Sequence, residues 1–241
     1  MHIEELDRPL TFVHMPKTAG TSVTTFLSSY FEPEKISTEF YGDYTSLPLN
    51  VQFRSGHFHY HQVKRLQPSY FMTFLRNPID RTISQYRSWH DPNKLGSSWL
   101  NDQNVQHVRW VQEASFDEFV MSDNVHVRAA IENVQTSLLS EYSPIDWRFL
   151  SSAFDTLEHD FHFFGIVERF DESLELLRSC FDGLGEYAVS PQAENRSMEL
   201  DVEPSAAALI RILELNWADM ALYQFASGLF TERRRVRKTT M

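Results

Sequence analysis

The stretch Thr11-Phe-Val-His-Met-Pro-Lys-Thr-Ala-Gly-Thr-Ser-Val23 decides the fold of this chain. It begins with an apolar, β-branched run that predicts a strand over residues 10–15, and the run ends at Pro16. A short polar loop with Lys17 follows, and from Val23 onward apolar residues recur at helical spacing. The pattern therefore predicts a strand, a loop and a helix whose first N–H groups form an anion site beside a lysine.

The loop differs from the common nucleotide-triphosphate loop, whose sequence is G-x-x-x-x-G-K-[ST]. In this chain Lys17 precedes Gly20 instead of following a glycine. A helix start beside a lysine still favours a phosphate-like anion. The sequence therefore predicts recognition of a phosphate-like group that does not require the chemistry of ATP.

Composition and charge restrict the class of protein. The chain has 241 residues, a net charge of −11 and 42% hydrophobic residues, which suits one α/β domain with a substantial core. The negative charge argues against broad nucleic-acid binding. No apolar run approaches a membrane-spanning length, the N-terminus lacks a signal-peptide layout, and the single cysteine, Cys180, suits a reducing compartment. We expect a cytoplasmic protein with a single domain over residues 1–241, in which residues 232–241 form a flexible basic tail.

Strand-like and helical patterns alternate along the chain. Further strands are expected at residues 51–55, 70–75 and 161–167. This alternation favours a P-loop-like, three-layer α/β sandwich with a mostly parallel central sheet and helices on both faces. The expected helices cover residues 23–31, 78–89, 116–121, 125–139, 147–157, 172–181 and 205–225.

Three polar groups of residues directly follow predicted strands: residues 16–22, the pair Gly56-His57, and residues 76–84. Ligands of open parallel sheets bind outside the carboxyl ends of the strands, so we expect these groups to line one site. In the third group, Arg76 and Ser84 could grip a second phosphate, because a guanidinium group matches phosphate oxygens. On spacing alone, a surface Arg–Asp pair with a capping serine is the competing interpretation.

Two of these groups resemble known motifs. Pro16-Lys17-Thr18-Ala19-Gly20-Thr21-Ser22 and the segment Leu75–Tyr86 resemble the two donor-binding motifs of sulfotransferases that use 3′-phosphoadenosine-5′-phosphosulfate (PAPS). The branch that the chain resembles contains carbohydrate-type enzymes related to heparan sulfate 2-O-sulfotransferase and its bacterial relatives. In that branch a Gly-His pair lies between the two motifs, and Gly56-His57 occupies this place. Residues 161–170 resemble the late strand of the family, so the resemblance spans most of the chain.

The resemblance implies sulfuryl transfer from PAPS to an acceptor hydroxyl without a metal ion. It implies that Lys17 stabilises the leaving phosphate and that His57 is the general base. The acceptor would be a carbohydrate, a glycolipid or a small metabolite alcohol, and the enzyme would be bacterial. The residues expected to hold the donor are Lys17, Thr18, Ala19, Gly20, Thr21 and Ser22 at the 5′-phosphosulfate, Arg76 and Ser84 at the 3′-phosphate, and Arg196 and Ser197 as auxiliary contacts.

Several alternatives stay open at this point. His59 or a carboxylate could serve as the base instead of His57, and the closely spaced histidines 57, 59 and 61 could hold a metal ion. His14 suits either a core position or a place near the donor, and Arg196-Ser197 suits a loop that caps the next helix. A P-loop kinase or nucleotide hydrolase explains the first motif but not the second. An inactive nucleotide-binding module disagrees with the intact set of Lys17, His57, Arg76 and Ser84.

Overall fold

The computed structural model describes residues 2–40, 47–65, 68–91, 105–184 and 200–240. The chain divides into two compact units, and each unit gathers segments that are distant in sequence. The first unit comprises residues 1–76, 135–195 and 221–241, and the second comprises residues 77–134 and 196–220. The single domain predicted for residues 1–241 stays a prediction.

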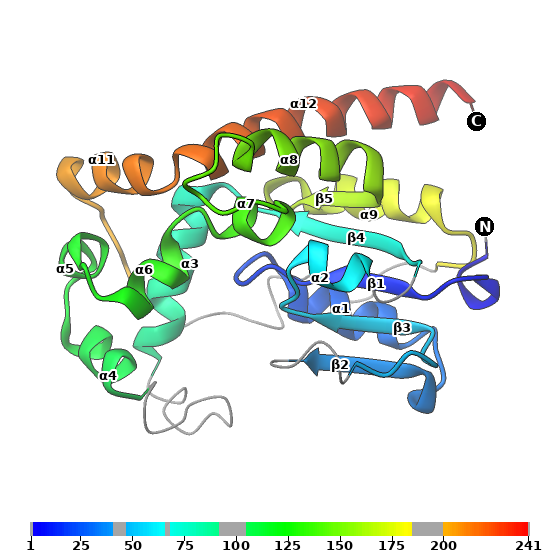
Figure 1. Ribbon diagram of the computed structural model, residues 1–241, viewed down its shortest axis with the longest axis horizontal. Coiled ribbons are helices and arrows are strands. Elements are labelled where there is room, and N and C mark those ends of the chain that lie inside the picture. Colours follow the sequence, from blue (N-terminus) through cyan, green and yellow to red (C-terminus); the bar gives the residue numbers. More distant parts are fainter. Residues whose placement is uncertain (1, 41–46, 66–67, 92–104, 185–199, 241) are drawn as a thin grey trace. The chain divides into compact units, whose positions relative to one another are not determined.

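A five-stranded parallel sheet forms the centre of the first unit (Figure 1). The strand order is β2-β3-β1-β4-β5, so that β1 lies in the middle between β3 and β4. The predicted α/β class and parallel sheet are confirmed. The edge strand β2, which has three consecutive polar residues, Ser37, Thr38 and Glu39, was absent from the sequence prediction. The strands are β1 (Leu10–Val13), β2 (Ile36–Phe40), β3 (Phe53–Gly56), β4 (Tyr70–Leu75) and β5 (Phe161–Ile166).

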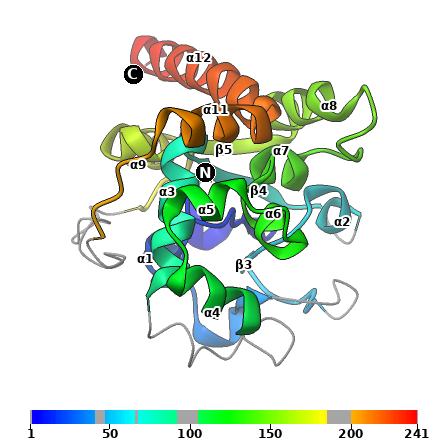
Figure 2. The same cartoon turned by 90° about the vertical axis from the view of Figure 1, so that its left-hand side faces the viewer.

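Helices cover both faces of this sheet, as predicted. Figures 1 and 2 show α1 and α9 on one face and α2 and α8 on the other. The helices of this unit are α1 (Gly20–Ser28), α2 (Tyr60–Lys64), α7 (Val134–Leu139), α8 (Phe149–Asp155), α9 (Phe170–Cys180) and the greater part of α12 (Trp217–Thr240). Short helical turns are η1 (Ile3–Glu5), η2 (Pro33–Lys35), η6 (Val167–Arg169) and the π-helical η5 (Thr156–Asp160).

The strand order determines where a ligand can bind. After β1 the chain crosses to β2 on one side of the sheet, whereas after β4 it returns at β5 on the other side. Neighbouring strands whose connections diverge in this way leave a crevice at their carboxyl ends. His14 directly follows β1, Arg76 directly follows β4, and His57 directly follows β3. The fold therefore places these three residues at one edge of the sheet.

The second unit consists of helices packed around an apolar core (Figure 2). Its helix α3 begins where the sequence predicted, because Asn77 accepts a hydrogen bond from the Ile79 amide at 2.9 Å and Pro78 occupies the first turn. The helices are α3 (Pro78–His90), α4 (Val105–Glu113), α5 (Phe116–Met121), α6 (Val125–Ile131) and α11 (Ala206–Leu215). Buried core residues include Tyr86, Trp89, Val108, Val111, Phe119, Val127, Ile131, Ala208, Ile212 and Leu215.

Two helices predicted as continuous are interrupted. The expected helix 125–139 breaks at Asn133, whose φ of 43° is left-handed. The Asn133 side chain accepts hydrogen bonds from the amides of Ala218 and Asp219 at 3.0 and 3.2 Å, and so caps the start of α12. The expected helix 205–225 breaks at Asn216, between α11 and α12. Tertiary capping by one asparagine thus overrides helical periodicity at two places.

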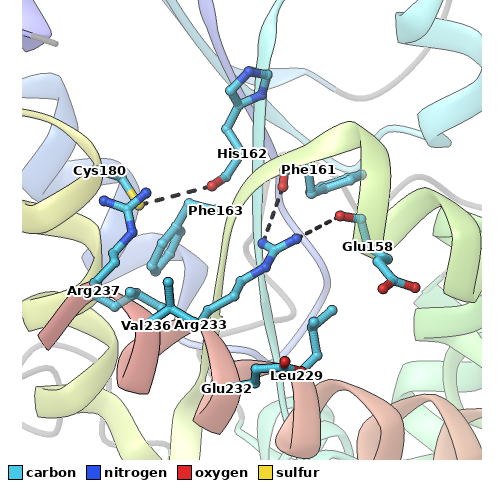
Figure 3. A pocket seen from close by; sticks show the side chains of 11 residues that line it. Glu158, Phe161, His162, Phe163, Cys180, Leu229, Glu232, Arg233, Val236 and Arg237 are labelled. Carbon is cyan, nitrogen blue, oxygen red and sulfur yellow. Dashed lines mark hydrogen bonds between the residues drawn. The ribbon is translucent and has the colours of Figure 1, made fainter. Parts of the chain in front are cut away.

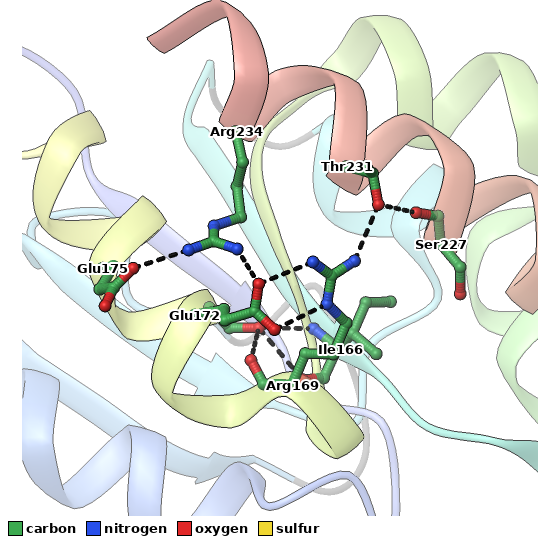
Figure 4. Close-up of polar contacts among 8 residues, drawn as sticks. Ile166, Arg169, Glu172, Glu175, Ser227, Thr231 and Arg234 are labelled. Carbon is green, nitrogen blue, oxygen red and sulfur yellow. Dashed lines mark hydrogen bonds and ion pairs between the residues drawn. The ribbon is translucent and has the colours of Figure 1, made fainter. Parts of the chain in front are cut away.

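The basic segment near the C-terminus differs from the expected flexible tail over residues 232–241, because residues 232–240 continue α12. Arg234 pairs with Glu172 and, at 2.7 Å, with Glu175 of α9 (Figure 4). Arg233 donates to the Glu158 carbonyl at 2.7 Å, and Arg237 donates to the Ser179 carbonyl. The arginines satisfy carboxylates and helix-end carbonyls, which is the physical reason that the segment is ordered as a helix.

Within the described part of the chain, no helix is both long enough and apolar enough to cross a membrane.

Candidate active site

The loop between β1 and α1 has an unusual backbone. Lys17 and Ala19 adopt left-handed conformations, with φ of 68° and 61°. Such a conformation costs a non-glycine residue roughly 1–2 kcal/mol, and it is concentrated at ligand-binding sites. The loop is held closed by Thr18, whose buried hydroxyl donates to the Met15 carbonyl at 2.9 Å. The predicted loop is thus a fixed, strained turn.

The start of α1 has the features of an anion site. Its N-cap residue Ala19 has no side chain that could accept hydrogen bonds from the first N–H groups of the helix. Thr21 is exposed, whereas Ser22 is buried. Gly20 lies against the ring of His14, and a Cβ atom at this position would come within 1.9 Å of the ring. Only glycine permits this approach of the helix start to the end of β1.

The His14 ring is enclosed by aromatic neighbours. It stacks on Phe12 with a centroid separation of 5.5 Å, and its centroid lies 4.5 Å from that of His57. The pKa of the His14 imidazole is lowered to about 3, mainly by burial and to a lesser extent by electrostatic repulsion from His57 and Lys17. His14 is therefore a neutral side chain that is partly buried and contacts His57. It combines features of both sequence interpretations, a core position and a place near the candidate site.

His14 should make the stability of the protein dependent on pH. Its folded pKa lies below its unfolded value, so the unfolded chain binds the extra proton and stability is lost as the pH falls below about 6.5. Between pH 7 and pH 5 we expect this residue to lower the free energy of unfolding by about 2 kcal/mol. Urea denaturation of the wild type and of His14→Phe at both pH values measures this contribution. An equal loss in both proteins would contradict it.

His57 is bound in one tautomer. Its Nδ1 lies 2.6 Å from the His14 carbonyl oxygen, and because a carbonyl only accepts, Nδ1 carries the hydrogen. Nε2 is then the nitrogen with the lone pair. Burial lowers the pKa of His57, the bond to His14 partly opposes this, and the charge of Lys17 lowers the pKa further. At neutral pH His57 is an uncharged imidazole within electrostatic reach of the Lys17 ammonium group.

The other two histidines of the trio lie at the start of α2 and within it. The His59 Nδ1 lies 3.0 Å from the Ser137 carbonyl, and His61 belongs to α2. Among the described residues, no group of three or more potential ligands is arranged to hold a metal ion.

Arg76 connects the end of β4 to the loop. Its Nη1 donates to the Lys17 carbonyl at 3.2 Å. Its own backbone forms a reciprocal pair with the side chain of Gln135 on α7, with the Arg76 amide donating to Oε1 and Nε2 donating to the Arg76 carbonyl, both at 2.9 Å. Sequence reasoning missed Gln135, because a single polar residue within a helical pattern carries no local sign of a partner 59 positions away.

The remaining predicted residues belong to the second unit or fall outside the described residues. Ser84 is buried on α3 in the second unit, whereas Arg76 belongs to the first. Arg81, between them in sequence, is buried and donates to the Ala130 carbonyl at 3.1 Å within the second unit. Arg196 and Ser197 lie outside the described residues. The structure thus brings together residues 17–22, His57 and Arg76.

A cavity of about 440 Å³ lies at the beginning of β5, between α9 and α12 (Figure 3). None of the predicted site residues that the structure describes lines it. Its two arginines, Arg233 and Arg237, donate hydrogen bonds to the main-chain carbonyls of Glu158 and Ser179. These bonds at helix ends give both arginines a structural role. Burial raises the pKa of the Cys180 thiol in its wall. We therefore place the candidate active site at the carboxyl ends of β1, β3 and β4 instead.

Comparison with known proteins gives a family. A family model described as "Sulfotransferase family" matches residues 5–226. No curated protein sequence matches the chain. Among solved structures, the chain is similar to the crystal structure of a sulfotransferase from Alicyclobacillus acidocaldarius, with 14% sequence identity, a TM-score of 0.47, and coverage of 91% of this chain and 95% of that chain.

Proposed function

Because the chain belongs to the sulfotransferase family and is thus a sulfotransferase, we propose that it takes the sulfuryl group from PAPS and transfers it to an acceptor hydroxyl. The observation that carries this proposal is the joint position of Lys17, His57 and Arg76 around a strained loop at a helix start. Lys17 and Arg76 offer two cationic groups to the phosphates of the donor. His57 offers a neutral base to the hydroxyl of the acceptor.

The residues of the loop fit the 5′ end of the donor. The N–H groups at the start of α1, over residues 18–21, have no capping side chain and can bind phosphate oxygens. The hydroxyls of Thr21 and Ser22 are proposed as further partners. PAPS supplies the activated sulfuryl group, and no metal ion is needed if oriented amides and one lysine neutralise the leaving phosphate.

His57 and Lys17 divide the chemistry between them. Transfer forms a bond between the acceptor oxygen and sulfur and breaks the bond between sulfur and the 5′-phosphate oxygen. The His57 Nε2 accepts the proton of the acceptor hydroxyl, because Nδ1 is already protonated toward the His14 carbonyl. The Lys17 ammonium group stabilises the charge that develops on the departing phosphate oxygen. Sulfuryl transfer, like phosphoryl transfer, depends mainly on positioning and electrostatics, which these residues provide.

The 3′-phosphate of the donor is assigned to Arg76, and the sequence motif adds Ser84, Arg196 and Ser197 as proposed partners. For the acceptor we propose a carbohydrate, a glycolipid or a small metabolite alcohol. Incubation with radiolabelled PAPS and a panel of these three classes identifies which one takes up the label.

A thermal-shift experiment tests the donor. Adenosine 3′,5′-bisphosphate at about 100 times its Kd should stabilise the folded protein by about 2.7 kcal/mol, because a ligand that binds only the native state shifts the unfolding equilibrium. The expected rise in Tm is roughly 5–10 °C. ATP with Mg²⁺ at the same concentration should raise Tm much less, since it lacks a 3′-phosphate.

The comparison also separates the alternatives. If ATP with Mg²⁺ stabilised the protein and adenosine 3′,5′-bisphosphate did not, this result would support a kinase or nucleotide hydrolase and contradict PAPS as the donor. Stabilisation by the bisphosphate without transfer to any acceptor would support an inactive nucleotide-binding module.

A further inference from the structure

Gln135 makes an unusual contact with the main chain at the end of β4. Its side-chain amide accepts a hydrogen bond from the Arg76 N–H and donates one to the Arg76 carbonyl, both at 2.9 Å. Gln135 is fully buried. Only one orientation of the amide satisfies both bonds, because its oxygen only accepts and its nitrogen only donates. The contact therefore fixes the backbone of Arg76 in position and direction.

The position of Arg76 matters because its side chain contacts the strained loop. Its Nη1 donates to the carbonyl of Lys17, whose φ is 68°. A guanidinium group binds phosphate through two parallel hydrogen bonds, and such binding depends on the direction of the side chain as well as on its charge. Arg76 directly follows the last pair of the sheet, Leu75–Ile166, so pairing within β4 does not determine that direction.

We infer that Gln135 is a positioning residue for recognition of the donor: its two bonds to the Arg76 backbone aim the guanidinium group at the 3′-phosphate. This inference rests on the proposed function, because it takes the 3′-phosphate of PAPS as the ligand of Arg76. Gln135 itself touches neither the donor nor the acceptor in this scheme. Its effect is on the preference for a nucleotide with a 3′-phosphate over one without it.

The experiment measures that preference directly. Isothermal titration gives the Kd of adenosine 5′-phosphate and the Kd of adenosine 3′,5′-bisphosphate, and their ratio is the 3′-phosphate selectivity. In Gln135→Leu, which removes both hydrogen bonds, we expect the ratio to fall by about tenfold. Gln135→Glu preserves the shape of the side chain but replaces its N–H hydrogen-bond donor with a negatively charged oxygen. In this variant we expect the ratio to fall further.

Thr136→Val is the matched control, because Thr136 is the next residue on α7 and is equally buried. It should lower Tm without changing the ratio. A ratio in both Gln135 variants equal to that of the wild type would overturn the inference, whatever their Tm. A wild type that does not prefer the bisphosphate would instead overturn the proposed donor and, with it, this role of Gln135.

Discussion

Lys17→Ala is expected to lower the turnover number of sulfuryl transfer by about 100- to 1,000-fold in a protein that stays folded. The ammonium group is the cation of the loop between β1 and α1, and its charge adds to the effect of burial, which is the main cause of the lowered pKa values of His14 and His57. In the proposed mechanism, its loss removes a charge that acts most strongly on the leaving phosphate in the transition state. Steady-state kinetics with saturating PAPS and a fixed acceptor measure the effect.

Lys35→Ala is the matched control for this substitution. Lys35 ends η2 and precedes β2, at the amino ends of the strands, so the same change of charge occurs away from the candidate site. It should leave turnover within about twofold of the wild type. If Lys17→Ala retained turnover close to that of this control, the catalytic role of Lys17 would be wrong.

His57→Ala is expected to lower turnover by about 100- to 10,000-fold while the Kd of adenosine 3′,5′-bisphosphate changes little. The reason is that the His57 Nε2 is the proposed proton acceptor, whereas binding of the nucleotide is assigned to the loop between β1 and α1 and to Arg76. His57→Asn is the sharper variant, because its side-chain amide can still donate to the His14 carbonyl but has no basic nitrogen. Both variants should be equally inactive.

The pH profile provides an independent check on His57. The base must be neutral, and burial lowers its pKa below the ordinary value of a histidine. Activity should therefore persist as the pH falls through about 6.5 and decline only at lower pH. His59→Ala, at the residue that pairs with the Ser137 carbonyl, should preserve activity. Loss of activity in His59→Ala together with activity in His57→Asn would move the base to His59.

Local sequence predicted the elements whose signals are local. Residues 70–75 are an apolar run that ends at Arg76-Asn77-Pro78, and this run coincides with β4. The Lys17 loop was predicted with its preceding strand and following helix, because the apolar patterns on its two sides have different periods. The positions of Lys17, His57 and Arg76 at one sheet edge follow from the same patterns, since parallel strands share the direction of their carboxyl ends.

Features that depend on distant residues were not predictable in this way. Asn133 breaks a helical pattern because it caps α12, whose first residues lie far along the chain. Gln135 binds the Arg76 backbone from another helix, and nothing in its neighbours indicates that partner. The basic run at residues 233–238 resembles a solvated tail until Glu172 and Glu175 are placed beside it. In each case a long-range polar contact, which has no periodicity, decides the local structure.

The order of segments in the first unit has a consequence for how the protein is made. A growing chain releases β1 to β4 early, but β5, which pairs with β4 from Phe71–Phe161 to Leu75–Ile166, follows only after the whole helical segment 77–134. Until then one edge of β4 has no neighbour in the sheet, and Arg76 lacks the side chain of Gln135. Pairing across such distances is slow, and an open strand edge favours association with other chains. The nascent protein therefore carries the loop between β1 and α1 before it can complete the candidate site, and the exposed edge of β4 is the surface that a chaperone would need to protect.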